Sequence, residues 1–136
     1  LKTFCKDYFH FGEVGKGAKS KLLNNFFSLG AATYVIELIK SAKKLDVDLE
    51  KLFAVAKLGS GNSTALNRIF DNVLKGDYTG FKFSTANTLK DLTYIQEMLK
   101  DVGNAEKLAD VKKSFYKKAV DEGHGDLFIS ELIQKD

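Results

Sequence analysis

The sequence predicts an all-α fold, a multi-helix domain built around one long, buried first helix. The 136 residues include no proline, and the apolar residues recur mostly at helical spacing. Strand-like alternation is confined to residues 8–11. The stretch from Leu22 to Ile36 carries no charged residue, so a helix there is apolar on nearly every face and belongs in a core. The length suits a single domain, and we expect one helical domain over residues 1–136.

The first helix is expected over residues 17–44, where Gly30 is the only turn-forming residue after the start. Its uncharged run is too short for a membrane span. The run also contains four polar residues: Asn24, Asn25, Ser28 and Thr33. We therefore expect a core helix and no membrane contact.

Two short helices are expected next. Asp46 and Asp48 each offer an N-cap to a helix that ends at Gly59. Ser63 begins another helix, whose apolar residues recur every three or four positions and which stops at Gly76. Polar residues that can cap a helix start, and glycines that can end one, thus divide this part of the chain into two helices.

The second half of the chain is expected to hold one loop and three helices. The loop covers residues 77–83, and Ser84 then caps a helix that Gly103 closes. A further helix is expected over 104–123, and a short one in the closing segment, 126–136. No linker or repeat interrupts this order, so the helices form a single domain.

Composition and charge limit the functions open to the chain. A formal net charge of +3 permits an anionic small molecule but gives no case for nucleic acid. The single cysteine, Cys5, excludes an internal disulfide and fits a reducing compartment, so we expect a cytoplasmic protein. His10 and His124 have no further ligands at suitable spacing, so no metal site is predicted. The chain begins without methionine or a secretory signal, and we expect a fragment of a longer protein.

Three glycines near the start, Gly12, Gly15 and Gly17, suggest a phosphate-binding loop at first. A phosphate loop needs the pattern G-x-x-x-x-G-K-[ST], and here the lysine comes one residue late, at Lys19. The dinucleotide pattern G-x-G-x-x-G does not match either, and no βαβ unit follows. The sequence therefore favours neither kind of phosphate loop.

A polar stripe on the first helix is the stronger signal. Gly17, Lys21, Asn25 and Ser28 are separated by four, four and three residues, so they share one helix face. If apolar neighbours desolvate Lys21, its pKa falls and a neutral amine becomes accessible. Gly17 leaves room for a ligand, and Asn25 can bind the ligand's oxygens. The alternative is an exposed edge with Lys21 reaching into solvent, which spacing alone favours.

The string Gly12-x-x-Gly15-x-Gly17-x-x-x-Lys21-x-x-x-Asn25 resembles the catalytic-helix signature of the β-hydroxyacid dehydrogenases. That family includes 3-hydroxyisobutyrate dehydrogenase and tartronate semialdehyde reductase, and 6-phosphogluconate dehydrogenase is a distant relative. The similarity covers about residues 11–133. It continues through four later features: Glu37, LGSGNS (58–63), GDYTGFKFSTANTLKDL (76–92) and GHGDLFISELI (123–133). One departure is Phe128, where the family usually has an aspartate.

The resemblance implies the helical C-terminal domain of such an enzyme, with the fold of the 6-phosphogluconate dehydrogenase C-terminal domain. The long first helix would leave an N-terminal Rossmann domain, absent from this chain, that binds most of the NAD or NADP. Lys21 would be the catalytic lysine that exchanges a proton with the substrate hydroxyl or carbonyl. Asn25 would orient the substrate, with Gly17 and Asn24 beside it.

The resemblance also places Lys90 and Phe83 on the cofactor side of the cleft. Without it, Lys90 would be interpreted as an exposed helical lysine beside Asp91. The expected partners are a small hydroxyacid substrate, the chain's own Rossmann domain and further copies in a homo-oligomer. The isolated domain is expected to be inactive.

Two hypotheses follow. The chain is the C-terminal domain of an NAD(P)-dependent hydroxyacid dehydrogenase, or it is a non-enzymatic helical dimerisation or binding module that kept the fold. The presence of Lys21, Asn25 and Lys90 together favours the enzyme, since a scaffold has no need of that set.

Overall fold

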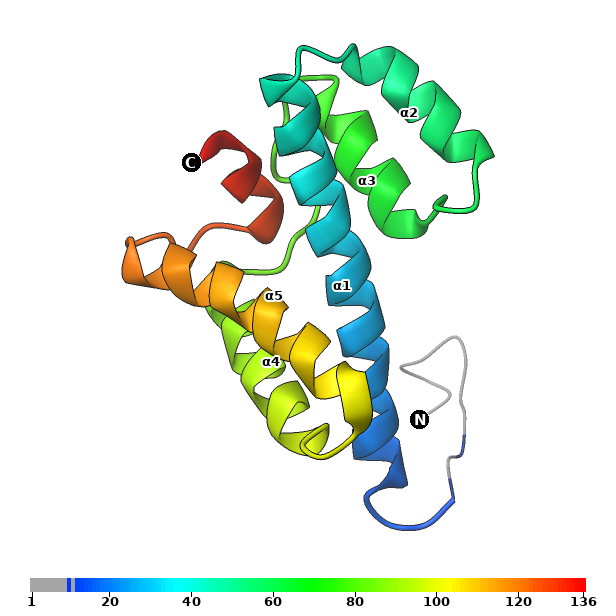
Figure 1. Cartoon of the computed structure of the whole chain (residues 1–136), viewed down its shortest axis with the longest axis vertical. Helices are drawn as coiled ribbons and strands as arrows, with labels where there is room; N and C mark the ends of the chain where they lie inside the picture. The colour runs from blue at the N-terminus through cyan, green and yellow to red at the C-terminus, as the bar shows by residue number, and fades with distance from the viewer. Residues whose placement is uncertain (1–9, 11) are drawn as a thin grey trace, which may run out of the picture.

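The computed structural model describes residue 10 and residues 12–136, and in this part the chain is all-helical (Figure 1). The all-α prediction is confirmed. The elements are α1 (Lys16–Lys44), α2 (Leu49–Leu58), α3 (Thr64–Val73), α4 (Thr85–Met98), α5 (Gly103–Asp121) and the 3₁₀ helix η1 (Ile129–Gln134). The strand-like segment at 8–11 lies outside the described residues, apart from His10, which is not in a strand.

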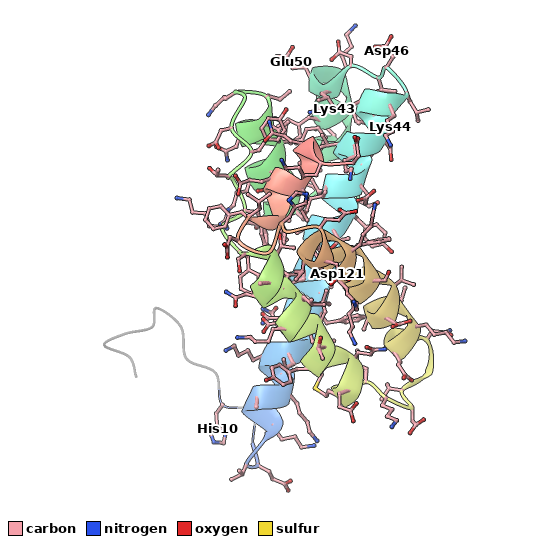
Figure 2. The ribbon with its side chains drawn as sticks, turned by 90° about the vertical axis from the view of Figure 1, so that its left-hand side faces the viewer. His10, Lys43, Lys44, Asp46, Glu50 and Asp121 are labelled. Atoms are coloured by element: carbon pink, nitrogen blue, oxygen red, sulfur yellow. The ribbon has the colours of Figure 1, made fainter. Side chains whose placement is uncertain are left out.

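Helix α1 is the axis of the domain, and the other helices pack along it (Figure 1). The α2–α3 pair lies beside its C-terminal half, and the antiparallel α4–α5 pair crosses nearer its N-terminal half. Figure 2 shows His10 beyond one end of α1 and Lys43, Lys44 and Asp46 at the other. Basic residues in the last turn suit the negative end of the helix dipole.

The core follows the C-terminal two thirds of α1. Leu29, Ala32, Ile36 and Ile39 are buried there, against buried side chains of α3, α4 and η1. By length and composition alone α1 could cross a membrane. Its packing against the other helices is instead that of the core helix of a folded domain.

The prediction that α1 is apolar on nearly every face, and buried for that reason, is wrong for one face. Leu23, Phe27 and Tyr34 are exposed, although the helix around them is uncharged. The neighbouring helices cover only part of the α1 surface. An uncharged sequence does not reveal which face has no neighbour.

The predicted helix starts at Asp48, Ser63 and Ser84 are confirmed by their capping hydrogen bonds. The Asp48 carboxylate accepts from the Lys51 amide at 3.0 Å, and the Ser63 hydroxyl accepts from the Leu66 amide at 3.0 Å. The Ser84 hydroxyl accepts from the amide three residues on at 3.2 Å. Asp46 is not a cap, because it occupies a turn with a positive φ of 54°.

Two predicted boundaries differ from the structure. Helix α4 ends at Met98 rather than at Gly103, because the chain turns early and Asp101 takes a left-handed φ of 65°. Gly103, with a φ of 50°, is instead the first residue of α5. The closing helix, η1, is a 3₁₀ helix. At its start the Glu131 carboxylate accepts a hydrogen bond from the Phe128 amide at 2.8 Å.

Candidate functional site

The polar stripe lies on the N-terminal turns of α1. Gly17, Asn24 and Lys21 are exposed, and Asn25 is half-buried. The described chain therefore does not supply the desolvation that the sequence suggested for Lys21. In the described chain Lys21 is exposed, as the alternative interpretation expects.

The glycines that precede the stripe shape the start of α1. Gly15 is its N-cap residue, with a φ of 90° in the left-handed region that favours glycine. A Cβ at Gly17 would meet nothing within 4 Å, so packing within the described chain does not require glycine there. This geometry begins a helix and forms no phosphate loop.

Asn25 connects the stripe to α4. Its Nδ2 donates a hydrogen bond to Oδ2 of Asp91 at 3.2 Å, across 66 residues of sequence. Asp91 is half-buried, and the adjacent Lys90 is exposed on the same helix. The structure thus brings Asn25 together with Asp91, the residue that follows Lys90.

Asp91 is the residue that sequence reasoning missed, because it was treated only as a neighbour of Lys90. A signal was available in the spacing of α4. Asp91 lies three residues after Thr88 and one before Leu92, and both of these are fully buried. A carboxylate at the edge of a core-facing stripe needs a partner on the neighbouring helix.

Phe83 is not part of this group. It is half-buried, and its side chain packs against the hydrophobic core. The Phe83 amide donates a hydrogen bond to the Phe81 carbonyl, and the Ile129 amide donates one to the Phe83 carbonyl, each at 2.9 Å. Phe83 precedes α4, whereas Lys90 lies in the second turn of that helix. Phe83 therefore holds the closing segment against the start of α4.

A hollow of about 220 Å³ lies elsewhere, between α1, α5 and the closing segment. Its lining carries both signs of charge and includes Glu37, Lys40, Lys118 and Glu122, but neither Lys21 nor the other predicted site residues. The stripe on α1 is therefore an open surface in this domain. Within residue 10 and residues 12–136, no three histidine, cysteine or acidic side chains are grouped to hold a metal ion.

Comparison with known proteins identifies the family. The family model described as NAD-binding of NADP-dependent 3-hydroxyisobutyrate dehydrogenase matches residues 15–135, nearly the whole chain. The chain belongs to this family. It therefore comes from a group of NAD(P)-dependent enzymes, and the resemblance inferred from the sequence is confirmed.

The fold agrees with that assignment. A crystal structure of 3-hydroxyisobutyrate dehydrogenase from Salmonella typhimurium matches with a TM-score of 0.77 and 22% identity. The match covers 88% of this chain but only 42% of that protein, so the chain spans less than half of its structural relative. No curated protein sequence matches the chain.

Two of the candidate site residues are exposed cations, a residue type that can bind a dinucleotide's phosphates. Lys21 and Lys90 present exposed ammonium groups on neighbouring helices, which suits the phosphates or carboxylate of bound molecules. The Asn25–Asp91 bond holds the two helices together between them. Lys21 and Lys90 thus lie on an open surface of this domain.

Proposed function

We propose that this chain is the C-terminal domain of an NAD(P)-dependent β-hydroxyacid dehydrogenase or reductase, acting with an N-terminal Rossmann domain that binds most of the cofactor. The observation that carries the proposal is the Asn25–Asp91 hydrogen bond, which joins the lysine stripe of α1 to the Lys90 helix. The family match and the 42% coverage of the structural relative support it. The single cysteine, Cys5, is the ground for a cytoplasmic location.

Lys21 is the proposed acid–base group. When bound, NAD(P) supplies the hydride acceptor or donor. The Lys21 amine removes the proton from the substrate hydroxyl during oxidation and returns a proton to the carbonyl oxygen during reduction. Because Lys21 is exposed here, closure of the Rossmann domain over α1 has to exclude water from it.

The neighbouring residues position the substrate. Asn25, with its amide group held by Asp91, orients the hydroxyacid on the lysine face. Gly17 and Asn24 are exposed beside it, where a substrate can approach the helix. Lys90 contacts the cofactor side. The packing of Phe83 favours a supporting role at the start of α4 over direct contact with the cofactor.

The test uses the longer protein in which this chain follows its Rossmann domain. Reduction of NAD⁺ and of NADP⁺ is measured with a panel of small β-hydroxyacids. We expect turnover with at least one of them, and a loss of about a hundredfold or more in Lys21→Ala, the range for a positioned acid–base group. Circular dichroism checks that the variant stays folded, as an exposed position predicts. Unchanged turnover in Lys21→Ala contradicts the proposed role.

The second candidate is a non-enzymatic helical dimerisation or binding module. The exposed apolar residues of α1, including Phe27 and Tyr34, are the observation that favours it. The same assay separates the two functions. An intact longer protein that binds no NAD(P) and oxidises no hydroxyacid is the result expected of the module.

A further inference from the structure

The hollow of about 220 Å³ between α1, α5 and the closing segment contains none of the candidate site residues. We call it the α5 hollow. Glu37, which lines it, lies about 24 Å beyond Lys21 along the axis of α1. The α5 hollow is therefore a separate part of the surface. The lining residues that matter here are Glu37 and Lys40 of α1, Phe115 and Ala119 of α5, and His124 and Leu132 of the following segment.

One wall of the α5 hollow is a single face of α1. Thr33, Ile36, Glu37 and Lys40 follow one another at intervals of one to three residues and span two helical turns, so they lie on the same side of the helix. Thr33 and Ile36 are buried, Lys40 is half-buried and Glu37 is exposed. This wall therefore has a buried floor and a charged rim.

The turn that ends α5 brings His124 into the lining. Gly123 takes a φ of 87°, in the left-handed region that favours glycine. The Gly123 amide donates to the Val120 carbonyl at 3.0 Å, and the His124 amide donates to the Ala119 carbonyl at 2.9 Å. These are the two bonds of a Schellman motif. The chain leaves this turn and returns to α1 as η1, which closes the hollow on a third side (Figure 1).

Apolar side chains from three elements give the α5 hollow a place for hydrocarbon. Ile36 and Ala119 are buried, Leu132 is half-buried, and Phe115 is 47% exposed. A ligand's apolar part would leave water on binding here. The volume is below the about 300–1,000 Å³ of clefts that take drug-sized ligands, so it suits a molecule of amino-acid size.

The charges of Glu37 and Lys40 are not neutralised by a neighbour. Among the described residues, ion pairs form only within α5. Glu37 and Lys40 are three residues apart on one helix and line the same hollow, yet they do not pair with each other. A ligand with a single charge can bind only one of them, whereas a zwitterion can bind both.

We propose that the α5 hollow binds a small zwitterion, an α-amino acid with an apolar side chain. The Glu37 carboxylate accepts hydrogen bonds from the ligand's ammonium group, and the Lys40 ammonium donates to the ligand's carboxylate. An α-amino acid carries both groups on one carbon, which suits two side chains whose Cβ atoms are about 5–6 Å apart. The ligand's side chain packs against Ile36 and Leu132. Neither Lys21 nor NAD(P) takes part in this binding.

The test titrates this 136-residue chain with L-alanine and L-leucine by isothermal titration calorimetry. Two analogues of L-leucine are the matched ligand controls: 4-methylpentanoate, which lacks the amine, and 3-methylbutan-1-amine, which lacks the carboxylate. We expect L-leucine to bind, and each analogue to bind about tenfold more weakly or worse, because each loses a charged hydrogen-bonding group. Thermal unfolding gives a second readout, since a ligand that binds only the folded chain raises its midpoint.

Variants of the two charged residues locate the site. Glu37→Gln and Lys40→Gln should each weaken L-leucine binding about tenfold. Lys44→Gln is the matched control, because Lys44 is exposed at the C-terminal end of α1, outside the lining (Figure 2). Circular dichroism verifies that the helices persist in all three variants.

Three results overturn the proposal. The first is that neither amino acid gives heat or raises the unfolding midpoint. The second is that an analogue with one charge binds as tightly as L-leucine. The third is that Glu37→Gln and Lys40→Gln leave binding unchanged, or that Lys44→Gln weakens it equally. No measurement uses catalysis or the cofactor, so failure here and failure of the proposed enzyme function are distinguishable.

Discussion

Thr33 and Tyr116 form the buried polar contact between α1 and α5. The Thr33 hydroxyl donates to the Leu29 carbonyl at 2.6 Å, which leaves the Tyr116 hydroxyl to donate to the Thr33 oxygen. Burial raises the pKa of Tyr116, and the negative charge of Glu37 acts in the same direction. The tyrosine therefore stays protonated in the folded protein.

Substitutions of Thr33 and Tyr116 should lower the free energy of unfolding by different amounts. Tyr116→Phe leaves Thr33 bonded to Leu29, so it should lower the free energy of unfolding by about 1 kcal/mol. Thr33→Val leaves the Tyr116 hydroxyl buried without its partner, and should cost more than Tyr116→Phe does, up to about 3 kcal/mol. Denaturant unfolding of the two variants measures both values. Equal costs would contradict the assigned donor and acceptor.

The raised pKa of Tyr116 also predicts how the difference in unfolding free energy between the unaltered chain and Tyr116→Phe changes with pH. Because the folded-state pKa of Tyr116 lies above its unfolded value, the unfolded chain ionises first as the pH rises. The stability that Tyr116 contributes is therefore full below about pH 10 and is lost above it. The stability difference between the unaltered chain and Tyr116→Phe should shrink at high pH, and unfolding at several pH values checks this.

At the scale of elements, α1 and α4 are held in register by the Asn25–Asp91 bond. Asp91→Leu removes the acceptor and frees the Asn25 amide, so in the longer protein substrate KM should rise and turnover should fall. Asp91→Asn is the matched control, because its side-chain oxygen can still accept from Asn25. Steady-state kinetics of both variants make the measurement. If Asp91→Leu behaves like Asp91→Asn, the bond does not position Asn25.

Local signals account for the helix boundaries that could be predicted. Asp48, Ser63 and Ser84 each bond an amide three residues ahead, an interaction contained within a few residues of sequence. The end of α4 could not be predicted in the same way. It depends on the left-handed turn at Asp101, a conformation that a non-glycine residue seldom takes.

The candidate site was predictable only in part, for a similar reason. The spacing of Gly17, Lys21 and Asn25 is a property of one helix, so the stripe could be derived from the sequence. The partnership of Asn25 with Asp91 is a contact between distant segments, and no local period encodes it. The exposure of Phe27 and Tyr34 depends likewise on which helices pack against α1.

At the scale of the whole molecule, α1 presents two separate exposed surfaces on different faces of the helix. One carries Lys21 and the Asn25–Asp91 bond, and the other carries Phe27 and Tyr34. Under the proposed function, the Rossmann domain closes over the surface that carries Lys21. The exposed lysine and the open surface around it also explain why we expect no catalysis from this domain alone.

The most direct test of the central claim is Lys21→Arg in the proposed two-domain enzyme. Arginine keeps the positive charge, but its guanidinium stays protonated and cannot accept the hydroxyl proton. If Lys21 is the acid–base group, turnover of the hydroxyacid should fall nearly as far as in Lys21→Ala, by about a hundredfold. If Lys21→Arg retains near-normal turnover, the lysine acts only through its charge, and the acid–base role is wrong.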